Sequence, residues 1–243
     1  MWVEALRRAR RRGGTGGSID DTPGAGWGHL YTRRVDVEAV ERVVAEHRRC
    51  VRCVEAGWLP RAHPVVGAVP AARILLVGQA PGPVEDDVTR PFAGRAGRQL
   101  MRWLVRAGFR DEADVRARVF MTSMTTCFPG RTPRDDGDRR PTAREVALCS
   151  PWLDGYLELL EPRLILVIGT LSLGRFLPGT RLDEVVGEAW LAPGVVAGDD
   201  AARFILPLPH PSGQSRWLND PARVARLDTA LRRLGALLEI VGA

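Results

Sequence analysis

Apolar positions along the chain form short strand-like runs that alternate with longer helix-like stripes. Three runs have the length and the branched side chains of buried parallel strands, at residues 74–77, 119–124 and 164–168. Weaker strand candidates lie at 190–196 and 203–208. Apolar residues at steps of three and four predict helices at 35–49, 98–107, 143–160 and 221–241, with a short helical turn at 170–176. This alternation predicts an α/β fold, with a parallel sheet and helices on both of its faces.

The loop after the first strand, residues 78–97, is long and rich in glycine and proline. It has neither the dinucleotide fingerprint nor the phosphate-binding P-loop pattern. Its one aromatic residue is Phe92, and its three acids are Glu85, Asp86 and Asp87. Ligands of open α/β sheets bind where such loops leave the carboxyl ends of strands, so we expect a pocket for a small planar group. The alternative is an acidic surface loop with Phe92 in the core.

The amino-acid composition favours an anionic binding partner and a protein that does not span the membrane. The formal net charge is +6, and every one of the 35 basic side chains is arginine. Arginine binds phosphate oxygens in pairs, although a basic balance alone does not identify the partner. No apolar run reaches membrane-spanning length, and no signal-peptide core is present, so we expect a cytoplasmic protein. Residues 1–34 read as a basic, glycine-rich arm, and residues 35–243 as a single domain.

The four cysteines predict a metal site. Cys50 and Cys53 form a C-x-x-C pair at a helix end, whereas Cys127 and Cys149 are well separated downstream. In a cytosolic protein four thiols are better explained by a metal site than by disulfides. Zinc ribbons present two close pairs, so the single pair favours a [4Fe–4S] cluster over structural zinc. The other open interpretations are a redox pair and ordinary buried thiols.

Three separated features then coincide in one order. Gly-Gln-Ala-Pro-Gly at 78–82 continues to Arg-Pro-Phe-Ala-Gly-Arg-Ala-Gly at 90–97, the cysteines are placed as described, and His-Pro-Ser at 210–212 follows the last strand candidate. Together these features resemble the uracil-DNA glycosylase superfamily, especially its iron–sulfur members, families 4 and 5. The resemblance covers about residue 40 to the C-terminus. It implies a three-layer α/β/α sandwich around a four-stranded parallel sheet.

The resemblance also implies roles for individual residues. Gln79 and His210 are the expected catalytic residues, and Cys50, Cys53, Cys127 and Cys149 would hold a [4Fe–4S] cluster. The expected base pocket consists of Gly78, Ala80, Pro81, Gly82, Asp86, Phe92 and Ser123. Phe92 would stack on a base rotated out of the duplex. The segment of Ser212, Arg216 and Trp217 would press into the DNA, with packing of Trp217 under the last helix as the alternative.

The tail at 213–217 departs from the family 4 pattern, and so do two residues of the expected site. Gln79 replaces a glutamate, and an amide cannot act as a general base but can orient water. Ser123 stands where family 4 usually has an asparagine, and a hydroxyl cannot make the paired hydrogen bonds of an amide. This departure favours broader base selection, with hypoxanthine and xanthine as candidates. Asp86 or Asp87 could supply a carboxylate, the alternative being that both are solvated.

The sequence thus predicts a monomeric, nucleoid-associated DNA glycosylase that excises uracil, and other deaminated bases, in base excision repair. His210 would donate to the oxyanion that develops on the leaving base, an effect worth roughly 3 kcal/mol. Two alternatives stay open. One is a catalytically weak protein on the same fold that binds damaged or single-stranded DNA. The other is an unrelated zinc-stabilised hydrolase of small nucleosides.

Overall fold

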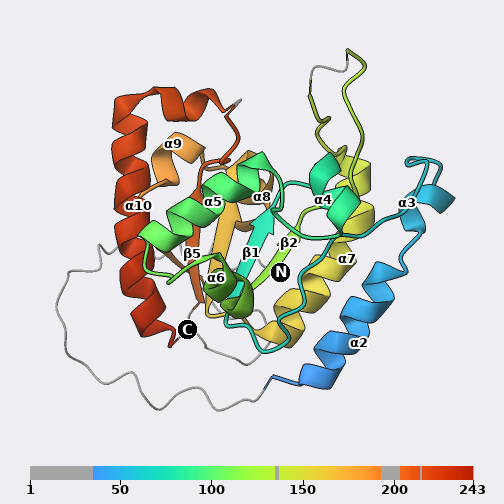
Figure 1. Cartoon of the computed structure of the whole chain (residues 1–243), viewed down its shortest axis with the longest axis horizontal. Coiled ribbons are helices and arrows are strands. Elements are labelled where there is room, and N and C mark those ends of the chain that lie inside the picture. Colours follow the sequence, from blue (N-terminus) through green and yellow to red (C-terminus); the bar gives the residue numbers. More distant parts are fainter. Residues whose placement is uncertain (1–34, 135–136, 193–202, 214, 243) are drawn as a thin grey trace.

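A five-stranded sheet lies at the centre of the molecule (Figure 1). The computed structural model describes residues 35–134, 137–192, 203–213 and 215–242, so the basic arm at 1–34 lies outside the described residues. The strands are β1 (Ile74–Gly78), β2 (Val119–Ser123), β3 (Leu164–Ile168), β4 (Trp190–Ala192) and β5 (Arg203–Leu208). Their order across the sheet is β2-β1-β3-β5-β4. The three strong strand predictions are confirmed.

The fifth strand corrects the expected four-stranded parallel sheet. β2, β1, β3 and β5 are parallel, and β4 adds an antiparallel edge through pairs such as Trp190 with Ile205. β4 has only three residues, and Leu191 between its ends is exposed. So short an edge strand leaves little apolar pattern in the sequence. Residues 193–196 of the predicted strand lie outside the described residues.

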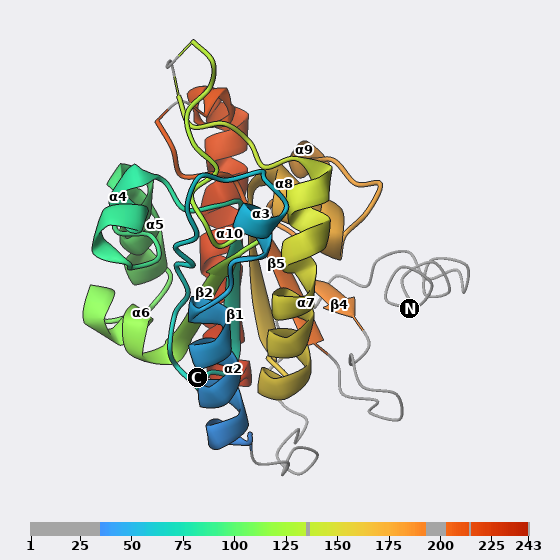
Figure 2. The same cartoon turned by 90° about the vertical axis from the view of Figure 1, so that its right-hand side faces the viewer.

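Helices cover both faces of the sheet (Figure 2). One face is covered by α5 (Arg95–Arg106), α6 (Glu112–Arg118) and α10 (Pro221–Ile240). The other is covered by α2 (Val37–Arg48), α7 (Ala143–Leu160) and α8 (Gly169–Phe176). Shorter helical turns are α3 (Arg52–Glu55), α4 (Pro83–Val88), α9 (Leu182–Val185) and η1 (Arg216–Asn219).

Alternate residues of each central strand pack into different hydrophobic cores, one on each face of the sheet. Ile74 and Leu76 of β1 pack under α5 and α10, whereas Leu75 and Val77 pack under α2 and α7. Both sides are fully buried, which explains the continuous apolar runs in the sequence. No helix in the described part of the chain is long and apolar enough to cross a membrane.

The parallel strands end at one edge of the sheet, and the loops that leave it carry the polar residues. Gly78 ends β1 and Ser123 ends β2, and the two are register partners. β3 ends beside β5, whose Leu208 pairs with Ile168, and His210 follows two residues later. Residues that are far apart in the sequence therefore meet at this edge, where open α/β sheets bind ligands.

Candidate functional site

A cavity of about 1090 Å³ opens at the carboxyl edge of the parallel strands. Its wall includes most of the residues that the sequence singled out: Gln79, Ala80, Pro81, Gly82, Phe92, Ser123, His210, Ser212 and Trp217. Gly78 is buried directly behind Phe92 and Ser123. The cavity thus brings together parts of the β1 loop, the end of β2 and the loop after β5. Its size suits a ligand as large as a nucleotide.

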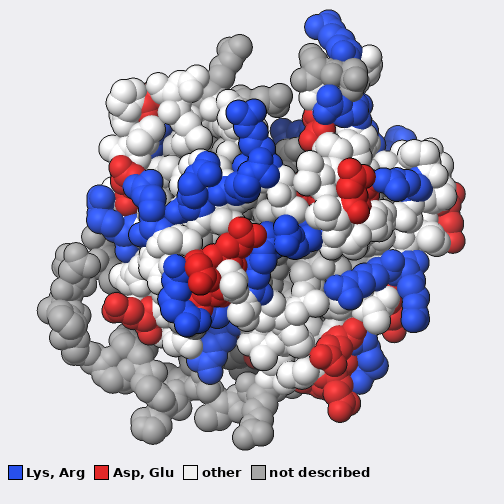
Figure 3. Space-filling model, viewed as in Figure 1, with Lys and Arg blue, Asp and Glu red and all other residues white. Residues whose placement is uncertain are grey.

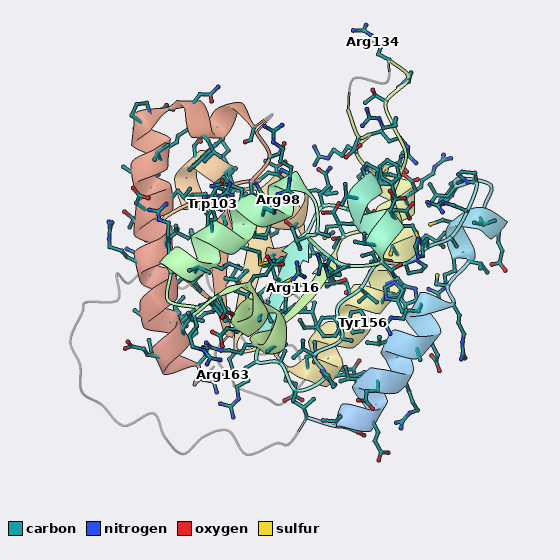
Figure 4. All side chains as sticks on the ribbon, in the orientation of Figure 1. Arg98, Trp103, Arg116, Arg134, Tyr156 and Arg163 are labelled. Carbon is teal, nitrogen blue, oxygen red and sulfur yellow. The ribbon has the colours of Figure 1, made fainter. Side chains whose placement is uncertain are left out.

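Phe92 is held in a backbone conformation that few side chains adopt. Its φ is +53°, in the left-handed region, and such strain in a non-glycine residue is most often found at functional sites. The guanidinium of Arg116, on α6, donates to the carbonyls of Pro91 and Phe92 at 3.0 and 3.2 Å. Figure 4 labels Arg116 and shows it on the α6 side of this loop. The turn is therefore fixed by a distant helix.

Two glycines make room for Phe92. A Cβ at Gly97 would lie 1.9 Å from the Phe92 carbonyl oxygen. A Cβ at Gly78 would lie 2.8 Å from the tip of the Phe92 ring and 3.3 Å from the Ser123 hydroxyl. Both positions therefore require glycine, because larger residues would push Phe92 out of its place.

His210 lies on the wall of the same cavity, and one hydrogen bond defines which of its ring nitrogens carries the proton. The backbone N–H of Ser212 donates to Nδ1 of His210 at 3.3 Å, so the proton of the neutral ring is on Nε2. Burial lowers the pKa of His210, which favours this neutral form near pH 7. The ring packs over Gly169, whose φ is +80° and whose hypothetical Cβ would lie 3.4 Å from His210. The imidazole is therefore positioned as a neutral hydrogen-bond donor.

Glu85 closes the loop between β1 and α5. Its two carboxylate oxygens accept the backbone N–H groups of Gly82 at 3.1 Å and Gly94 at 2.7 Å. This carboxylate lies on the cavity wall but is engaged in holding the loop. This role was not predicted, although the place of Glu85 three residues after the N-cap Gly82 is a capping signal.

Asp86 does not lie on the cavity wall, contrary to its expected place in the base pocket. The residue is 4% exposed, and its carboxylate accepts from Arg61 and from Nδ1 of His63, the latter at 3.1 Å. Thr89 bonds the other ring nitrogen of His63 at 2.9 Å. The backbone of His63 also bonds Cys127. Asp86 thus links the β1 loop to the segment beside the cysteines.

Gln79 and Ser123 lie on the cavity wall at the ends of neighbouring strands. The carbonyl of Gln79 accepts from the Thr125 backbone at 3.3 Å, and that of Gly78 accepts from Met124 at 3.0 Å. These bonds continue the β1–β2 pairing beyond the strands and hold the backbone of Gln79 and of the residues that follow Ser123. The side-chain amide of Gln79 and the hydroxyl of Ser123 are polar groups on the cavity wall that a ligand can bond.

Trp217 packs as the alternative interpretation had it. It is 8% exposed, belongs to the core beneath α10, and donates its indole N–H to Asp183. Its edge lies on the cavity wall, but it is not an exposed wedge. Ser212 lies on the cavity wall too, and the side chain of Arg216 lies outside the described residues.

The four cysteines line one small second cavity, next to the first. Cys50 and Cys53 flank the start of α3, Cys127 follows β2, and Cys149 lies in α7. Burial, with a smaller contribution from the neighbouring thiols, raises the pKa of Cys53 to about 11. Burial raises the pKa of Cys127 to about 12, although the backbone of His63 acts against this shift. Within the described residues, no group of three or more His, Cys, Asp or Glu side chains has the spacing to hold a single metal ion.

Polar groups around the thiols come from two segments, α7 and the residues that follow β2. The indole of Trp152 donates to Cys50 Sγ at 3.4 Å, and the hydroxyl of Thr126 lies 3.7 Å from Cys149 Sγ. The buried hydroxyl of Thr125, on the same cavity wall, has no partner among the described residues. Such a group is a donor for a ligand in this cavity.

His47 supports these groups, a role that was not predicted from the sequence. Its ring bonds Tyr156 and Thr126, each at 2.8 Å, and stacks on Trp152 with centroids 4.5 Å apart. Burial, followed by the charge of Arg52, lowers the pKa of His47 to about 3. The available signal was its position three residues before Cys50, which places both on one side of a helix end.

The two cavities share part of their walls. Pro129 lines both. Arg139 lines the large cavity and donates twice to Glu145, which lines the cysteine cavity. That pairing lowers the pKa of Glu145 to about 2. Glu145 also caps α7: its carboxylate accepts from the Thr142 N–H, and its own N–H donates to the Thr142 hydroxyl.

Comparison with known proteins agrees with this geometry. The family model of the uracil DNA glycosylase superfamily matches residues 64–235. The type-4 uracil-DNA glycosylase of Thermotoga maritima is 31% identical over 188 residues, covering 75% of this chain and 85% of that protein. The type-4 enzyme of Sulfurisphaera tokodaii is 32% identical over 134 residues, covering 55% and 56%. The type-5 uracil-DNA glycosylase of Pyrobaculum aerophilum is 35% identical over 112 residues, covering 42% and 46%.

Proposed function

Because the chain belongs to the uracil DNA glycosylase superfamily, we propose that it excises uracil from DNA in base excision repair, by hydrolysis of the N-glycosidic bond. The observation that carries this proposal is the presence of Phe92 and His210 on the wall of one cavity at the strand ends. One is an aromatic face and the other a neutral donor, and excision of a flipped base needs both.

Phe92 receives the extruded base. A base in a duplex is out of reach, so it must leave the stack at a cost of a few kcal/mol. A preformed aromatic face replaces part of the lost stacking, and stacking on an aromatic side chain is worth roughly 1–3 kcal/mol per base. Because Arg116 and the two glycines hold Phe92 in place, the ring needs no reordering when the base arrives.

Because Phe92 is packed so closely against Gly97, adding one methyl group at that glycine should strongly reduce uracil excision. Gly97→Ala would put a Cβ 1.9 Å from the Phe92 carbonyl oxygen and so displace the ring. We expect kcat/KM for uracil excision to fall at least about tenfold, matching a stacking loss near 1.4 kcal/mol. Single-turnover excision of a labelled oligonucleotide measures this.

Gly155→Ala, in α7, is the matched control for the Gly97 variant. A Cβ there has nothing within 4 Å, so excision should stay at the wild-type level. If both alanine variants excise uracil as well as the wild type, the account of how Phe92 is held is wrong.

His210 stabilises the leaving base. As the glycosidic bond breaks, positive charge develops on the sugar and negative charge on the uracil oxygen. The Nε2–H of neutral His210 donates to that oxygen, whose charge is small in the ground state, so the bond favours the transition state.

Gln79 orients the water. Among the residues that the structure describes, three carboxylates lie on the cavity wall, Glu85, Asp138 and Asp183, and each already accepts bonds from protein groups. The amide of Gln79 is therefore the better candidate to hold the water near the sugar carbon. A sugar cation is reactive enough to need positioning of water more than deprotonation of it.

The state of His210 sets the pH dependence. Because burial lowers its pKa below the ordinary value of about 6.5, the neutral donor persists at and above that pH. We expect the single-turnover rate to be flat above pH 6.5 and to fall only in more acidic solution, as His210 takes up a proton. The same shift makes the folded state less stable below pH 6.5, because the unfolded chain binds that proton first. A rate that rises as the pH falls through 6.5 would mean that the imidazolium is the active form.

The four cysteines are proposed to hold a [4Fe–4S] cluster. The donor set is four thiols on one cavity wall, and the buried Thr125 hydroxyl there lacks a partner among the described residues. A cluster takes four thiolates that are further apart than those around one zinc ion, whose Zn–S bonds are about 2.3 Å. When bound, the cluster supplies a crosslink and no chemistry at the base. It would tie α3, the segment after β2, and α7 together beside the base cavity.

An excision assay tests the function. Labelled oligonucleotides carrying uracil, hypoxanthine, xanthine or a thymine mismatch are treated with the protein, and abasic product is measured. We expect product from uracil, and product from a second deaminated base because Ser123 reads the base edge less strictly than an amide. Tight binding with no abasic product would instead support a damaged-DNA binding protein. Release of base only from free nucleosides would support a nucleoside hydrolase.

A further inference from the structure

One face of α5 carries a row of arginines. Arg95, Arg98, Arg102 and Arg106 are three or four residues apart, and all are exposed. The opposite face packs into the core through Leu100, Met101, Trp103 and Leu104. Figure 3 shows blue side chains in a band that follows α5 across the viewed face. We call these four residues the α5 arginine row.

The arginine row works against the stability of its own helix. α5 contains no acidic residue, and Arg95 and Arg98 lie in its first turn, where the helix dipole disfavours positive charge. Like charges four residues apart, as at Arg98, Arg102 and Arg106, also destabilise a helix. Folding alone therefore does not explain this sequence.

Little in the described part of the chain neutralises the row. Arg106 pairs with Asp228 of α10 at 2.7 Å, and Arg102 donates to Gln99. Among the residues that the structure describes, none forms an ion pair with Arg95 or Arg98. The end of the row nearest the base cavity is thus the end with the most available charge.

The row also starts at the base cavity. Arg95 lies on the cavity wall, and the row runs away from it along α5 for about 16 Å, at 1.5 Å per residue. In Figure 4, Arg98 and Trp103 mark the exposed and buried faces of this helix. In B-form DNA a strand presents one phosphate per about 3.4 Å of axis, so this length corresponds to roughly five nucleotides.

We infer that the α5 arginine row binds the phosphates of the DNA strand on one side of the extruded nucleotide. This inference rests on the proposed function, because the nucleotide in the cavity fixes where the strand must run. Guanidinium groups bind phosphate oxygens in pairs, and such contacts set the register of the DNA without reading its sequence. The row would thus align the substrate while Phe92 and His210 act on the base.

Salt dependence tests the inference. The double variant Arg98→Gln, Arg102→Gln removes two charges, leaves the ion pair of Arg106 intact, and keeps good helix formers. Duplex binding is measured as log Kd against log salt concentration. The slope should fall by about 1.8, at about 0.9 per phosphate contact. Lengthening the flank on one side of the uracil should improve wild-type binding more than that of the variant.

Two controls make the result decisive. Arg42→Gln, Arg232→Gln removes two exposed arginines from α2 and α10 and should leave the slope unchanged. Arg98→Lys, Arg102→Lys keeps the charge and should keep most of the slope. Equal slopes for the wild type and for the Arg98→Gln, Arg102→Gln variant would overturn the inference. The row would then serve an acidic partner other than DNA. If the wild type binds DNA but releases no base, the proposed function fails while the slopes still test the row.

Discussion

Replacing His210 with alanine is expected to lower the single-turnover rate of uracil excision by about 100- to 1,000-fold, the effect of losing one donor to a developing oxyanion. The ring is partly buried on the cavity wall and its Nδ1 is occupied by the Ser212 N–H, so Nε2–H is the donor left for a ligand. Since that bond strengthens as the base departs, its loss should appear in the rate and hardly in the affinity. The measurement compares single-turnover rates and DNA Kd for wild type and variant.

An asparagine at position 210 provides the control for this loss. Its amide can donate a hydrogen bond but cannot titrate, so His210→Asn should recover part of the rate and show no acidic fall in activity. If His210→Ala weakened binding and rate by the same factor, the histidine would be a binding or structural residue. If it changed neither, the assignment of the leaving-group donor would be wrong.

Removing one thiol should have the largest effect on stability. We expect Cys149→Ser to abolish the brown colour and the broad visible absorption that a [4Fe–4S] cluster gives, and to lower bound iron. Loss of a metal site belongs to the few mechanisms that cost more than about 4 kcal/mol. For a chain of this size, that corresponds to a fall in Tm of roughly 10 °C. Thermal unfolding at a fixed scan rate, with iron analysis, measures both effects.

Ser150→Ala is the matched control, one position further along α7. Its hydroxyl donates only within the helix, to the carbonyl of Ala147, so colour, iron and Tm should stay as in the wild type. A colourless wild type that holds zinc, or a Cys149→Ser protein that keeps its colour and Tm, would contradict the proposed cluster.

The sequence predicted those helices and strands whose apolar pattern is contained within the element itself. The buried runs of β1, β2 and β3 and the amphipathic α10 were all identified, because continuous or periodic apolar residues record burial directly. α4 and α6 were missed. α4 is six residues long and buries only Asp86, and α6 buries the single apolar residue Val115, so neither has a readable period.

Site residues that belong to a sequence motif were predicted. Roles that depend on contacts between residues far apart in the sequence were missed. The structure brings Phe92 and His210 to one cavity, as the motifs implied. The sequence held no sign that Arg116 would hold the Phe92 turn from α6. Asp86 was placed in the base pocket because it neighbours the motif in the sequence. In the helix, however, its carboxylate turns toward Arg61 and His63. Such partners depend on tertiary structure and not on spacing.

In the proposed reaction the extruded base lies between the ring of Phe92 and the imidazole of His210. A crystal structure with DNA carrying a uracil nucleotide whose glycosidic bond resists hydrolysis tests it most directly. We expect the uracil ring stacked on Phe92, with a uracil oxygen within hydrogen-bond distance of His210 Nε2. A uracil that lies in the duplex stack, or in the cavity but away from both side chains, would contradict it.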